Sequence, residues 1–246
     1  MILKGKTALV TGGGVRVGKA ITLALAQAGA NVVVNYSRSA QEAEETAVVA
    51  RTLGVGALPV MADISDPEQV ARMVAQASER FGGVDVLVNS ASLWAKTSIP
   101  TTDVTQWRRI IGIALDGAFY CSNAIAPHML AKGEGAIINI VDLSAWQPFP
   151  NYAAHSVAKA GLLALTRQLA VELAPAVRVN AVAPGPVLPP PEYTPAMIEH
   201  TAGKTLLGRW GTPADISQAV LFLLQADYIN GDCLIVDGGE RLGGHR

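Results

Sequence analysis

The feature that most constrains the fold is a regular alternation of short apolar runs with stretches of helical periodicity. Each run has the length of a strand, and a helical pattern follows it. The seven runs are Thr7–Val10, Asn31–Asn35, Ala57–Met61, Val84–Val88, Ala136–Val141, Val177–Val182 and Cys233–Val236. Such alternation predicts a parallel sheet with helices on both faces, because right-handed crossovers place a helix over each strand pair. The predicted fold class is therefore a doubly wound α/β sheet.

Length and composition favour one globular domain that acts on a small molecule. The chain has 246 residues, of which 50% are apolar and 16% charged, with a formal net charge of −1. These values exclude an intrinsically disordered chain and a coiled coil. They also give no basic surface for nucleic acid or for an anionic membrane. Since no linker, repeat or shift in composition divides the chain, we expect residues 1–246 to form a single domain with a small-molecule substrate.

The sequence predicts neither a metal site nor secretion. Cys121 and Cys233 lack the spacing of a zinc site or a disulfide framework, and we expect both to be buried thiols. The glycines at positions 12–14 break the apolar amino terminus before it reaches the length of a signal peptide. No apolar run approaches the roughly 20 residues that a membrane-spanning helix needs. We therefore expect a cytoplasmic protein.

Short sequence signals mark the start of several helices and one irregular loop. Ser39–Glu42 and Thr212–Asp215 resemble capping boxes, and Asp66, which a proline follows, resembles an N-cap. A cluster of prolines spans residues 184–195, directly after the sixth predicted strand. Prolines at this density favour an irregular connection, so we expect a mobile substrate loop over about residues 185–208.

A glycine-rich turn follows the first predicted strand and leads into a helical pattern at Lys19–Ala28. Glycines at such a turn let the backbone bend tightly and approach a pyrophosphate, while the N–H groups that begin the helix face the anion. The predicted dinucleotide-binding residues of this turn are Thr11, Gly12, Gly14, Arg16, Val17 and Gly18. The alternative is a tight strand-to-helix connection without a ligand.

The end of the second predicted strand indicates which dinucleotide binds. Enzymes that bind NAD place an acidic residue about 20 residues after the glycine turn, where it binds the free 2′-hydroxyl of the ribose. This chain has Ser37, Arg38 and Ser39 there, and no carboxylate. Arg38 together with Arg16 can bind a 2′-phosphate through charge-assisted hydrogen bonds, which predicts NADP(H) as the cofactor. The alternative is that Arg38 is a solvated loop charge.

Several motifs together resemble those of the short-chain dehydrogenase/reductase family over the whole chain. They are the glycine turn, Asp63 after the third strand, Asn89-Ser90-Ala91 after the fourth, His155–Lys159, Pro184-Gly185 after the sixth, and Val236–Gly239. The resemblance implies a single-domain Rossmann fold in which Asp63 contacts the adenine of the cofactor. The other cofactor contacts that it implies are Ile64, Asn89, Ser90, Ala91, Lys159, Pro184, Gly185 and Val187, the last three beside the nicotinamide.

Within that family, several positions resemble the pteridine-reductase branch. They include Arg16, residues 36–39, the run from Asn89 to Trp94, and Asp142 at the end of the fifth strand. The resemblance implies that Trp94 stacks on a pterin and that Ser92 lies in the same substrate pocket. A tryptophan in a loop can equally cover a hydrophobic edge, so both interpretations of Trp94 stay open.

The catalytic group departs from the family pattern at three of its four positions. Members of the family commonly reduce a carbonyl with Asn, Ser, Tyr and Lys. Here Lys159 is retained, whereas His155 takes the tyrosine position, Asp142 the serine position and Ala114 the asparagine position. The pteridine-reductase branch also has an aspartate at the serine position, where it assists protonation of the ring.

We predict that Asp142 and His155 form a pair that donates a proton during reduction. A general acid needs a pKa near the working pH, and histidine as a residue type meets this requirement better than tyrosine. The carboxylate favours an imidazolium, whereas Lys159, one helical turn away, disfavours it. If the pair acts in this way, reduction fades above roughly neutral pH.

Two nearby hydroxyl groups offer alternatives to this pair. Tyr152 lies three residues before His155 and competes as a proton donor, although aromatic residues at helix starts often only pack. Ser144 can replace the missing serine hydroxyl if the end of the strand bends. We consider both alternatives weaker than the Asp142–His155 pair.

These residues leave three functions open. The leading prediction is an NADP(H)-dependent oxidoreductase that reduces a carbonyl or a C=N bond, with pterin-like substrates. The second is a keto-reductase for acyl, sugar or alcohol substrates, which the same scaffold also serves. The third is an NADP(H)-binding sensor or assembly subunit whose catalysis has decayed, because three of the four catalytic positions differ.

The family resemblance also implies a homotetramer. It would assemble through the helices at about residues 102–130 and 156–172 and through the carboxy-terminal strand. Leu162, Leu165, Leu169 and Leu173 have the spacing of one buried helix face. An internal core would produce the same pattern, so the spacing does not distinguish the two.

Overall fold

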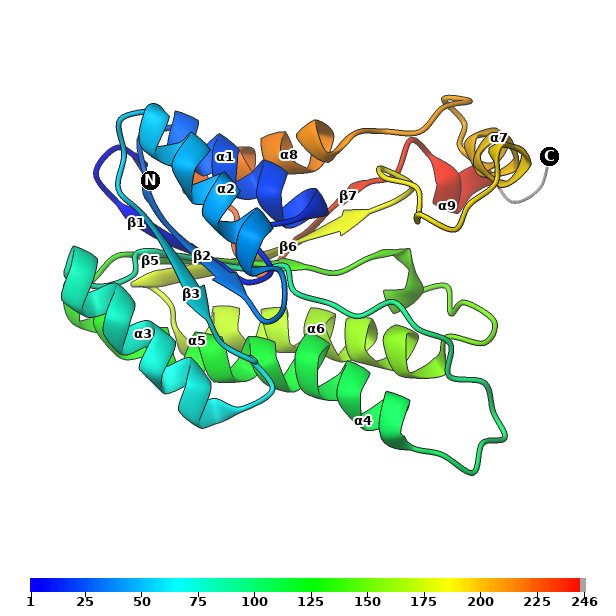
Figure 1. Cartoon of the computed structure of the whole chain (residues 1–246), viewed down its shortest axis with the longest axis horizontal. Helices are drawn as coiled ribbons and strands as arrows, with labels where there is room; N and C mark the ends of the chain where they lie inside the picture. Colours follow the sequence, from blue (N-terminus) through cyan, green and yellow to red (C-terminus); the bar gives the residue numbers. More distant parts are fainter. Residues whose placement is uncertain (244–246) are drawn as a thin grey trace.

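Seven parallel strands form one sheet in the computed structural model, which describes residues 1–243 (Figure 1). The strands are β1 (Thr7–Val10), β2 (Asn31–Tyr36), β3 (Ala57–Met61), β4 (Val86–Asn89), β5 (Gly135–Ile140), β6 (Val177–Pro184) and β7 (Cys233–Val236). Their order in the sheet is β3-β2-β1-β4-β5-β6-β7, and every neighbouring pair is parallel. The predicted doubly wound α/β class is confirmed.

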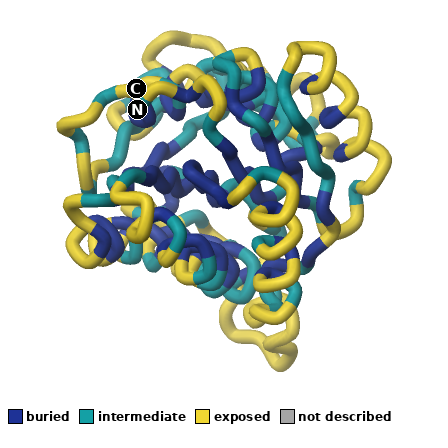
Figure 2. Tube along the Cα trace, turned by 90° about the vertical axis from the view of Figure 1, so that its left-hand side faces the viewer, coloured by how far each residue is buried: buried dark blue, intermediate teal, exposed yellow. Residues whose placement is uncertain are grey.

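Helices cover both faces of the sheet (Figure 1). One face carries α1 (Arg16–Gln27), α2 (Ala40–Thr52) and α8 (Pro213–Gln225), and the other carries α3 (Pro67–Phe81), α4 (Thr105–Ile111), α5 (Gly117–Lys132) and α6 (Ala153–Glu172). The two short helices α7 (Pro195–Lys204) and α9 (Glu240–Gly243) lie at the end toward which β6 and β7 point. Figure 2 shows buried residues in the middle of the molecule. Leu9 on β1, Leu87 on β4 and Ile137 on β5 have no exposed surface. Strands buried on both faces explain why the runs are apolar without alternation.

The strand order places a crevice at one end of the sheet. β1 pairs with β2 on one side and with β4 on the other, so the chain winds in opposite directions from this point. In open α/β sheets, ligands bind outside the carboxyl ends of the strands at such a reversal. The turn after β1 and the loop after β4 therefore meet at the predicted dinucleotide site.

All three predicted helix starts are present, and two of them have capping hydrogen bonds from side chains. Asp66 accepts hydrogen bonds from the backbone of Glu68 and Gln69 at 2.9 and 3.3 Å, and Asp215 accepts one from the Thr212 backbone at 2.7 Å. The helix start predicted at Ser39 is confirmed, since Ser39 is the N-cap residue of α2, but its side chain makes no capping hydrogen bond. Its ψ of 61° departs from the extended backbone of an N-cap, which would place the hydroxyl over the first turn of α2.

One helical stretch is long and contains an apolar window. α4, a π-helical segment at Gly112–Asp116 and α5 run together from Thr105 to Lys132, and the most apolar window of this stretch has a mean hydropathy of 1.3, so by length and composition alone it could cross a membrane. Within its most apolar window, 44% of the residues are buried inside the domain, where α5 packs against β4 and β5. The expectation that no continuous apolar run reaches about 20 residues stands, because polar residues interrupt this stretch, and its length comes from the π-helical segment that joins the two helices.

Burial settles two further sequence predictions. Leu162, Leu169 and Leu173 are at most 8% exposed and belong to the internal core, so that core explains the leucine spacing on α6. Cys121 is fully buried as predicted, but Cys233 is only partly buried because it lies on the edge strand β7. Burial raises the pKa of both thiols to about 12.

Candidate functional site

A cavity of about 1030 Å³ opens outside the carboxyl ends of the central strands. Its walls come from the glycine turn, the ends of β2 and β3, the loop after β4, the start of α6 and the loop after β6. Ligand pockets commonly have volumes of about 300–1,000 Å³, so this cavity has room for a large ligand. Because these segments are far apart in the sequence, the sheet order is what brings them together.

The glycine turn forms the floor of the cavity. Gly12 has a positive φ of 63°, and a Cβ atom at Gly18 would lie 2.2 Å from the carbonyl oxygen of Gly12. The N-cap residue of α1, Val15, provides no side-chain hydrogen bond, and the first turn of α1 has no acidic residue. The N–H groups of that turn are therefore available to an anion, which fits a pyrophosphate.

Two arginines lie at the mouth of the same cavity. Arg16 and Arg38 are both exposed cavity-lining residues, as is Ser37 on the turn after β2, and the half-buried Ser39 lines the cavity beside them. Arg16 has a positive φ of 50°, and its guanidinium donates a hydrogen bond to the Leu188 carbonyl at 3.1 Å. Arg16 thereby connects the glycine turn to the loop after β6. The positive charges of Arg16 and Arg38 at this end of the cavity fit a phosphate group on the ribose of a dinucleotide.

Most of the predicted cofactor residues line this one cavity. They are Gly12, Arg16, Val17, Gly18, Ser37, Arg38, Ser39, Asp63, Ile64, Ser90, Ala91, Lys159, Pro184 and Gly185. Thr11, Gly14, Asn89 and Val187 lie behind the wall instead. Thr11 Oγ1 accepts hydrogen bonds from the backbone N–H groups of Ser90 and Ala91 at 2.9 and 3.0 Å, which ties the two loops together.

The other three residues behind the wall also make internal contacts. A Cβ atom at Gly14 would lie 2.8 Å from the Cα atom of Ala43, so this glycine lets α2 approach the turn. The Asn89 amide donates to Asn139 at 2.8 Å. Val187 packs into the core beside α8, and its neighbour Leu188 lines the cavity in its place.

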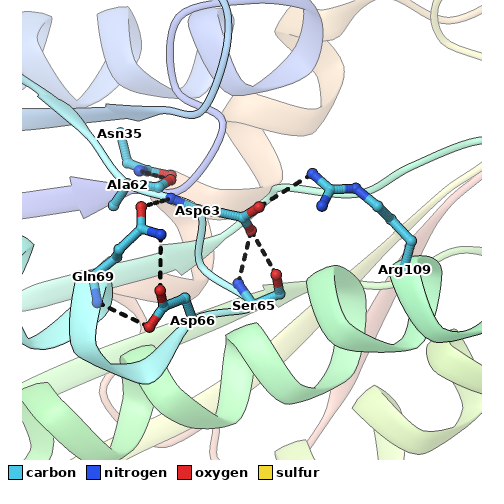
Figure 3. Close-up of polar contacts among 7 residues, drawn as sticks. All are labelled: Asn35, Ala62, Asp63, Ser65, Asp66, Gln69 and Arg109. Carbon is cyan, nitrogen blue, oxygen red and sulfur yellow. Dashed lines mark hydrogen bonds and ion pairs between the residues drawn. The ribbon is translucent and has the colours of Figure 1, made fainter.

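Asp63 is held firmly at the far end of the cavity (Figure 3). Its Oδ1 atom accepts hydrogen bonds from the Ser65 backbone at 3.1 Å and the Ser65 hydroxyl at 2.7 Å, and its Oδ2 atom lies 3.2 Å from the Arg109 guanidinium. Gln69 accepts a hydrogen bond from the Asp63 backbone at 2.9 Å. Burial alone would raise the pKa of Asp63, but the hydrogen bonds from Ser65 and the charge of Arg109 hold it below its ordinary value.

The residues predicted to be catalytic meet at the opposite end of the cavity. Asp142 follows β5, and its Oδ2 atom lies 2.5 Å from Nε2 of His155 on the first turn of α6. The other oxygen of Asp142 accepts hydrogen bonds from the Ser144 backbone at 2.9 Å and from the Ser144 hydroxyl. Lys159 donates to the Ile140 carbonyl at 2.7 Å. The carboxylate, rather than Lys159, is therefore the charged group in direct contact with the imidazole.

Burial and charge define the state of this group. Burial alone would raise the pKa of Asp142, but the hydrogen bond from His155 and the charge of Lys159 outweigh it and hold the pKa below its ordinary value. Burial lowers the pKa of Lys159, and the charge of Asp142 opposes this effect. His155 is 3% exposed, and its Nδ1 atom has no hydrogen-bond partner within residues 1–243. Asp142 is thus a charged hydrogen-bond acceptor, while one imidazole nitrogen remains unpaired.

The aromatic residues near this group have different placements. Trp94 lines the cavity and is 40% exposed, and its ring stacks on Tyr152 with centroids 4.1 Å apart. It also meets the His155 ring edge-on at 4.8 Å. Tyr152 is therefore packed against Trp94, and it does not belong to the cavity wall. Ser92 lies exposed on the rim near Trp94.

The remaining position of the four-residue pattern lies in an unusual helical segment. Ala114 is 2% exposed and sits within the π-helical segment Gly112–Asp116. Such segments are rare and frequently occur at functional sites. The described residues contain no group of three or more His, Cys, Asp or Glu side chains that could hold a metal ion.

Sequence analysis missed several residues of the cavity wall. Arg109 comes from α4, and Tyr193 and Trp210 come from the segment after β6, where their rings meet edge-on at 6.3 Å. The Arg108-Arg109 pair was visible in the sequence, but only the packing of α4 shows that Arg109 faces the cavity. The proline-rich segment gave no periodicity from which the side that Tyr193 faces could be inferred.

Comparisons with known proteins agree with this architecture. Residues 14–240 match the family model described as Enoyl-(Acyl carrier protein) reductase. The chain is 35% identical over 241 residues to the 3-oxoacyl-(acyl-carrier-protein) reductase FabG of Staphylococcus aureus, with 95% of this chain and 97% of that protein covered. It is 36% identical over 248 residues to the 3-oxoacyl-(acyl-carrier-protein) reductase of Synechocystis sp., with 96% and 97% covered.

Solved structures extend the similarity to three dimensions. The acetoin dehydrogenase YohF from Salmonella typhimurium superimposes with a TM-score of 0.90 at 36% identity, covering 98% of each chain. A short chain dehydrogenase from Bacillus anthracis superimposes with a TM-score of 0.87 at 35% identity, covering 99% of this chain and 100% of that one. The chain therefore belongs to the short-chain dehydrogenase/reductase family of oxidoreductases.

Proposed function

We propose that this oxidoreductase is an NADP(H)-dependent keto-reductase, which reduces a carbonyl group by hydride transfer. The observation that carries the proposal is the contact between Asp142 and His155, beside the retained Lys159, in the same cavity as the glycine turn and two arginines. Relatives named as 3-oxoacyl reductases and an acetoin dehydrogenase favour a ketone over a pterin as substrate. The keto-reductase alternative from the sequence therefore becomes the leading one.

The phosphate groups of the cofactor would lie along one end of the cavity. The free N–H groups of α1 would bind the pyrophosphate, and Arg16 and Arg38 would bind the 2′-phosphate. Lys159 would bind the ribose near the nicotinamide, and Pro184 and Gly185 would lie beside that ring. When bound, the cofactor supplies the hydride.

His155 would supply the proton that a reduced carbonyl needs. Its Nε2 atom is engaged by Asp142, so we assign the donation to Nδ1, which is buried and has no hydrogen-bond partner within residues 1–243 and which the substrate oxygen would have to reach. Donation converts the imidazolium to a neutral imidazole. The Nε2 atom keeps its proton, which stays hydrogen-bonded to the Asp142 carboxylate. Asp142 stabilises the charged ring before this step and fixes its orientation throughout.

A pterin-like substrate, with reduction of a C=N bond, is the second candidate. The observation that favours it is the exposed ring of Trp94 at the substrate end, which Ser92 accompanies on the rim. An exposed tryptophan offers a flat surface on which a planar heterocycle can stack. This candidate corresponds to the pteridine-reductase branch, toward which the relatives above do not point.

We also propose that the protein is a cytoplasmic homotetramer. The support lies on the outer surfaces of α5 and α6, where Phe119, Val157 and Val171 are exposed by 45%, 49% and 77%. Apolar side chains on adjacent helices suit contact with another copy of the chain. Sedimentation analysis tests this proposal, and a monomer at micromolar concentration would refute it.

The function is tested by combining a turnover screen with a binding titration. NADPH oxidation is measured with a 3-oxoacyl thioester, a small diketone and a dihydropterin, and the affinities for NADPH and NADH are measured by calorimetry. We expect tighter binding of NADPH and turnover with at least one ketone. Failure of both cofactors to bind, or tighter binding of NADH, overturns the proposal. Binding of NADPH without turnover of any compound favours the sensor or assembly subunit instead.

A further inference from the structure

The Asp63 end of the cavity carries a cation that the proposed reduction does not use. Arg109 extends from α4, and its guanidinium lies 3.2 Å from Oδ2 of Asp63, which follows β3 (Figure 3). Both side chains line the cavity. The two residues are 46 positions apart in the sequence, so the pair joins the edge of the sheet to a helix of the outer layer.

The two oxygens of the Asp63 carboxylate differ in how much hydrogen bonding they can still accept. Oδ1 already accepts two hydrogen bonds from Ser65. Oδ2 is contacted by Arg109 alone among the described residues. A carboxylate oxygen has about two acceptor sites, so Oδ2 can accept one more hydrogen bond. An exocyclic amine, such as that of adenine, is the kind of donor that this site suits.

Arg109 influences both the charge and the direction of this carboxylate. Its positive charge helps to keep the pKa of Asp63 low against the effect of burial, so the carboxylate stays ionised. Ionised acceptors form hydrogen bonds roughly twice as strong as neutral ones. The side chains of Asp63 and Arg109 are 25% and 37% exposed, so the pair is partly shielded from water yet open to the cavity. Loss of the guanidinium would leave Oδ2 without its only protein contact in the described residues.

We propose that Arg109 is a positioning residue for the adenine ring of the cofactor, acting by aiming Asp63 Oδ2 at the 6-amino group. This inference rests on the proposed dinucleotide site. Arg108 offers a matched control, since it is the adjacent residue on α4, is exposed, and forms no salt bridge within the part of the chain that the structure describes. Removing either arginine changes the net charge by the same amount, so only the position differs.

The test compares NADPH with its deamino analogue, in which hypoxanthine replaces adenine and the 6-amino group is absent. Affinities are measured by calorimetry on the full-length wild type and on Arg109→Ala, Arg108→Ala and Asp63→Asn. We expect Arg109→Ala to weaken NADPH about tenfold while changing the affinity for the deamino analogue less than about twofold. Asp63→Asn should have the same pattern, and Arg108→Ala should change neither affinity.

A double variant tests whether Arg109 acts through Asp63. If it does, the variant that carries both Arg109→Ala and Asp63→Asn binds NADPH no more weakly than the worse single variant. Additive losses would overturn the inference, as would equal losses for NADPH and the deamino analogue, or the same loss in Arg108→Ala. Should Arg109→Ala fail to fold, Arg109→Gln replaces it in the same comparison. If the wild type binds neither compound, the proposed function fails, which is a separate result.

Discussion

Replacing Asp142 by Asn tests the state of the pair at the substrate end. The change removes the charge that the buried imidazole contacts at 2.5 Å and keeps the size of the side chain. A hydrogen bond that involves a charged group contributes about 1.5–3 kcal/mol to stability. For a chain of this length, 1 kcal/mol shifts the Tm by about 2–4 °C. The variant should therefore melt roughly 3–12 °C below the wild type at pH 7.

The stability difference between Asp142→Asn and the wild type should shrink as the pH falls. The pKa of Asp142 is lower in the folded protein than in the unfolded chain, because the hydrogen bond from His155 and the charge of Lys159 outweigh burial. A carboxyl of this kind contributes its full stability above its unfolded pKa, about 4, and loses it as the pH falls through the folded value. The difference between variant and wild type should be widest above about pH 5 and narrow below about pH 4.

Thermal melts of both proteins at several pH values measure this directly. Glu79→Gln is the control, because it removes a carboxylate from an exposed site on α3. The reasoning is refuted if the Asn variant is as stable as the wild type at pH 7. It is also refuted if the stability difference keeps its full size in acid.

Three further predictions concern the cavity. His155→Phe should slow hydride transfer about 100-fold, because the proposed acid is lost, and single-turnover oxidation of NADPH checks this; an unchanged rate removes His155 from the mechanism. Arg38→Ala should weaken NADPH about tenfold in a calorimetric titration but leave NADH unaffected, and equal losses would contradict binding of the 2′-phosphate. Gly18→Ala should abolish nucleotide binding measured by fluorescence titration, because its Cβ would lie 2.2 Å from the Gly12 oxygen; normal affinity would show that the turn adapts.

Most of the fold could be predicted because its local signals agree with one another. Strands that are covered on both faces need apolar side chains on both faces, so each run stood out from the helices beside it. Strand boundaries were less certain: β4 begins at Val86 rather than Val84, and β6 extends to Pro184 rather than Val182. The apolar run at β4 begins before the hydrogen-bonded strand does, and the apolar run at β6 ends before the strand does. Apolar composition therefore does not mark where the hydrogen bonds between strands begin and end.

Features that depend on packing between distant segments were not predictable. The helix from Thr105 to Lys132 is continuous only because a π-helical segment joins α4 to α5, and nothing in the sequence marks that segment. Likewise, the sequence motif located the start of α2 at Ser39 but did not reveal that the Ser39 side chain makes no capping hydrogen bond. Local patterns indicate what a segment favours, whereas tertiary contacts decide its final geometry.

The candidate site was predictable where a motif determines the backbone. The glycine turn and the loop after β4 line the cavity because the strand order brings them together at the carboxyl edge. Arg109 was not predictable, since its role depends on which face of α4 meets Asp63. Val187 and Leu188 show the same limit, because one residue of difference in an irregular loop decides which side chain enters the core.

The pH dependence of the chemical step tests the central claim most directly. NADPH oxidation is followed in a single turnover with a ketone substrate, under conditions in which hydride transfer limits the rate. If the imidazolium of His155 donates the proton, the rate falls as the pH rises. A rate that stays constant into the alkaline range would contradict the account, because a neutral imidazole cannot deliver the proton in this way.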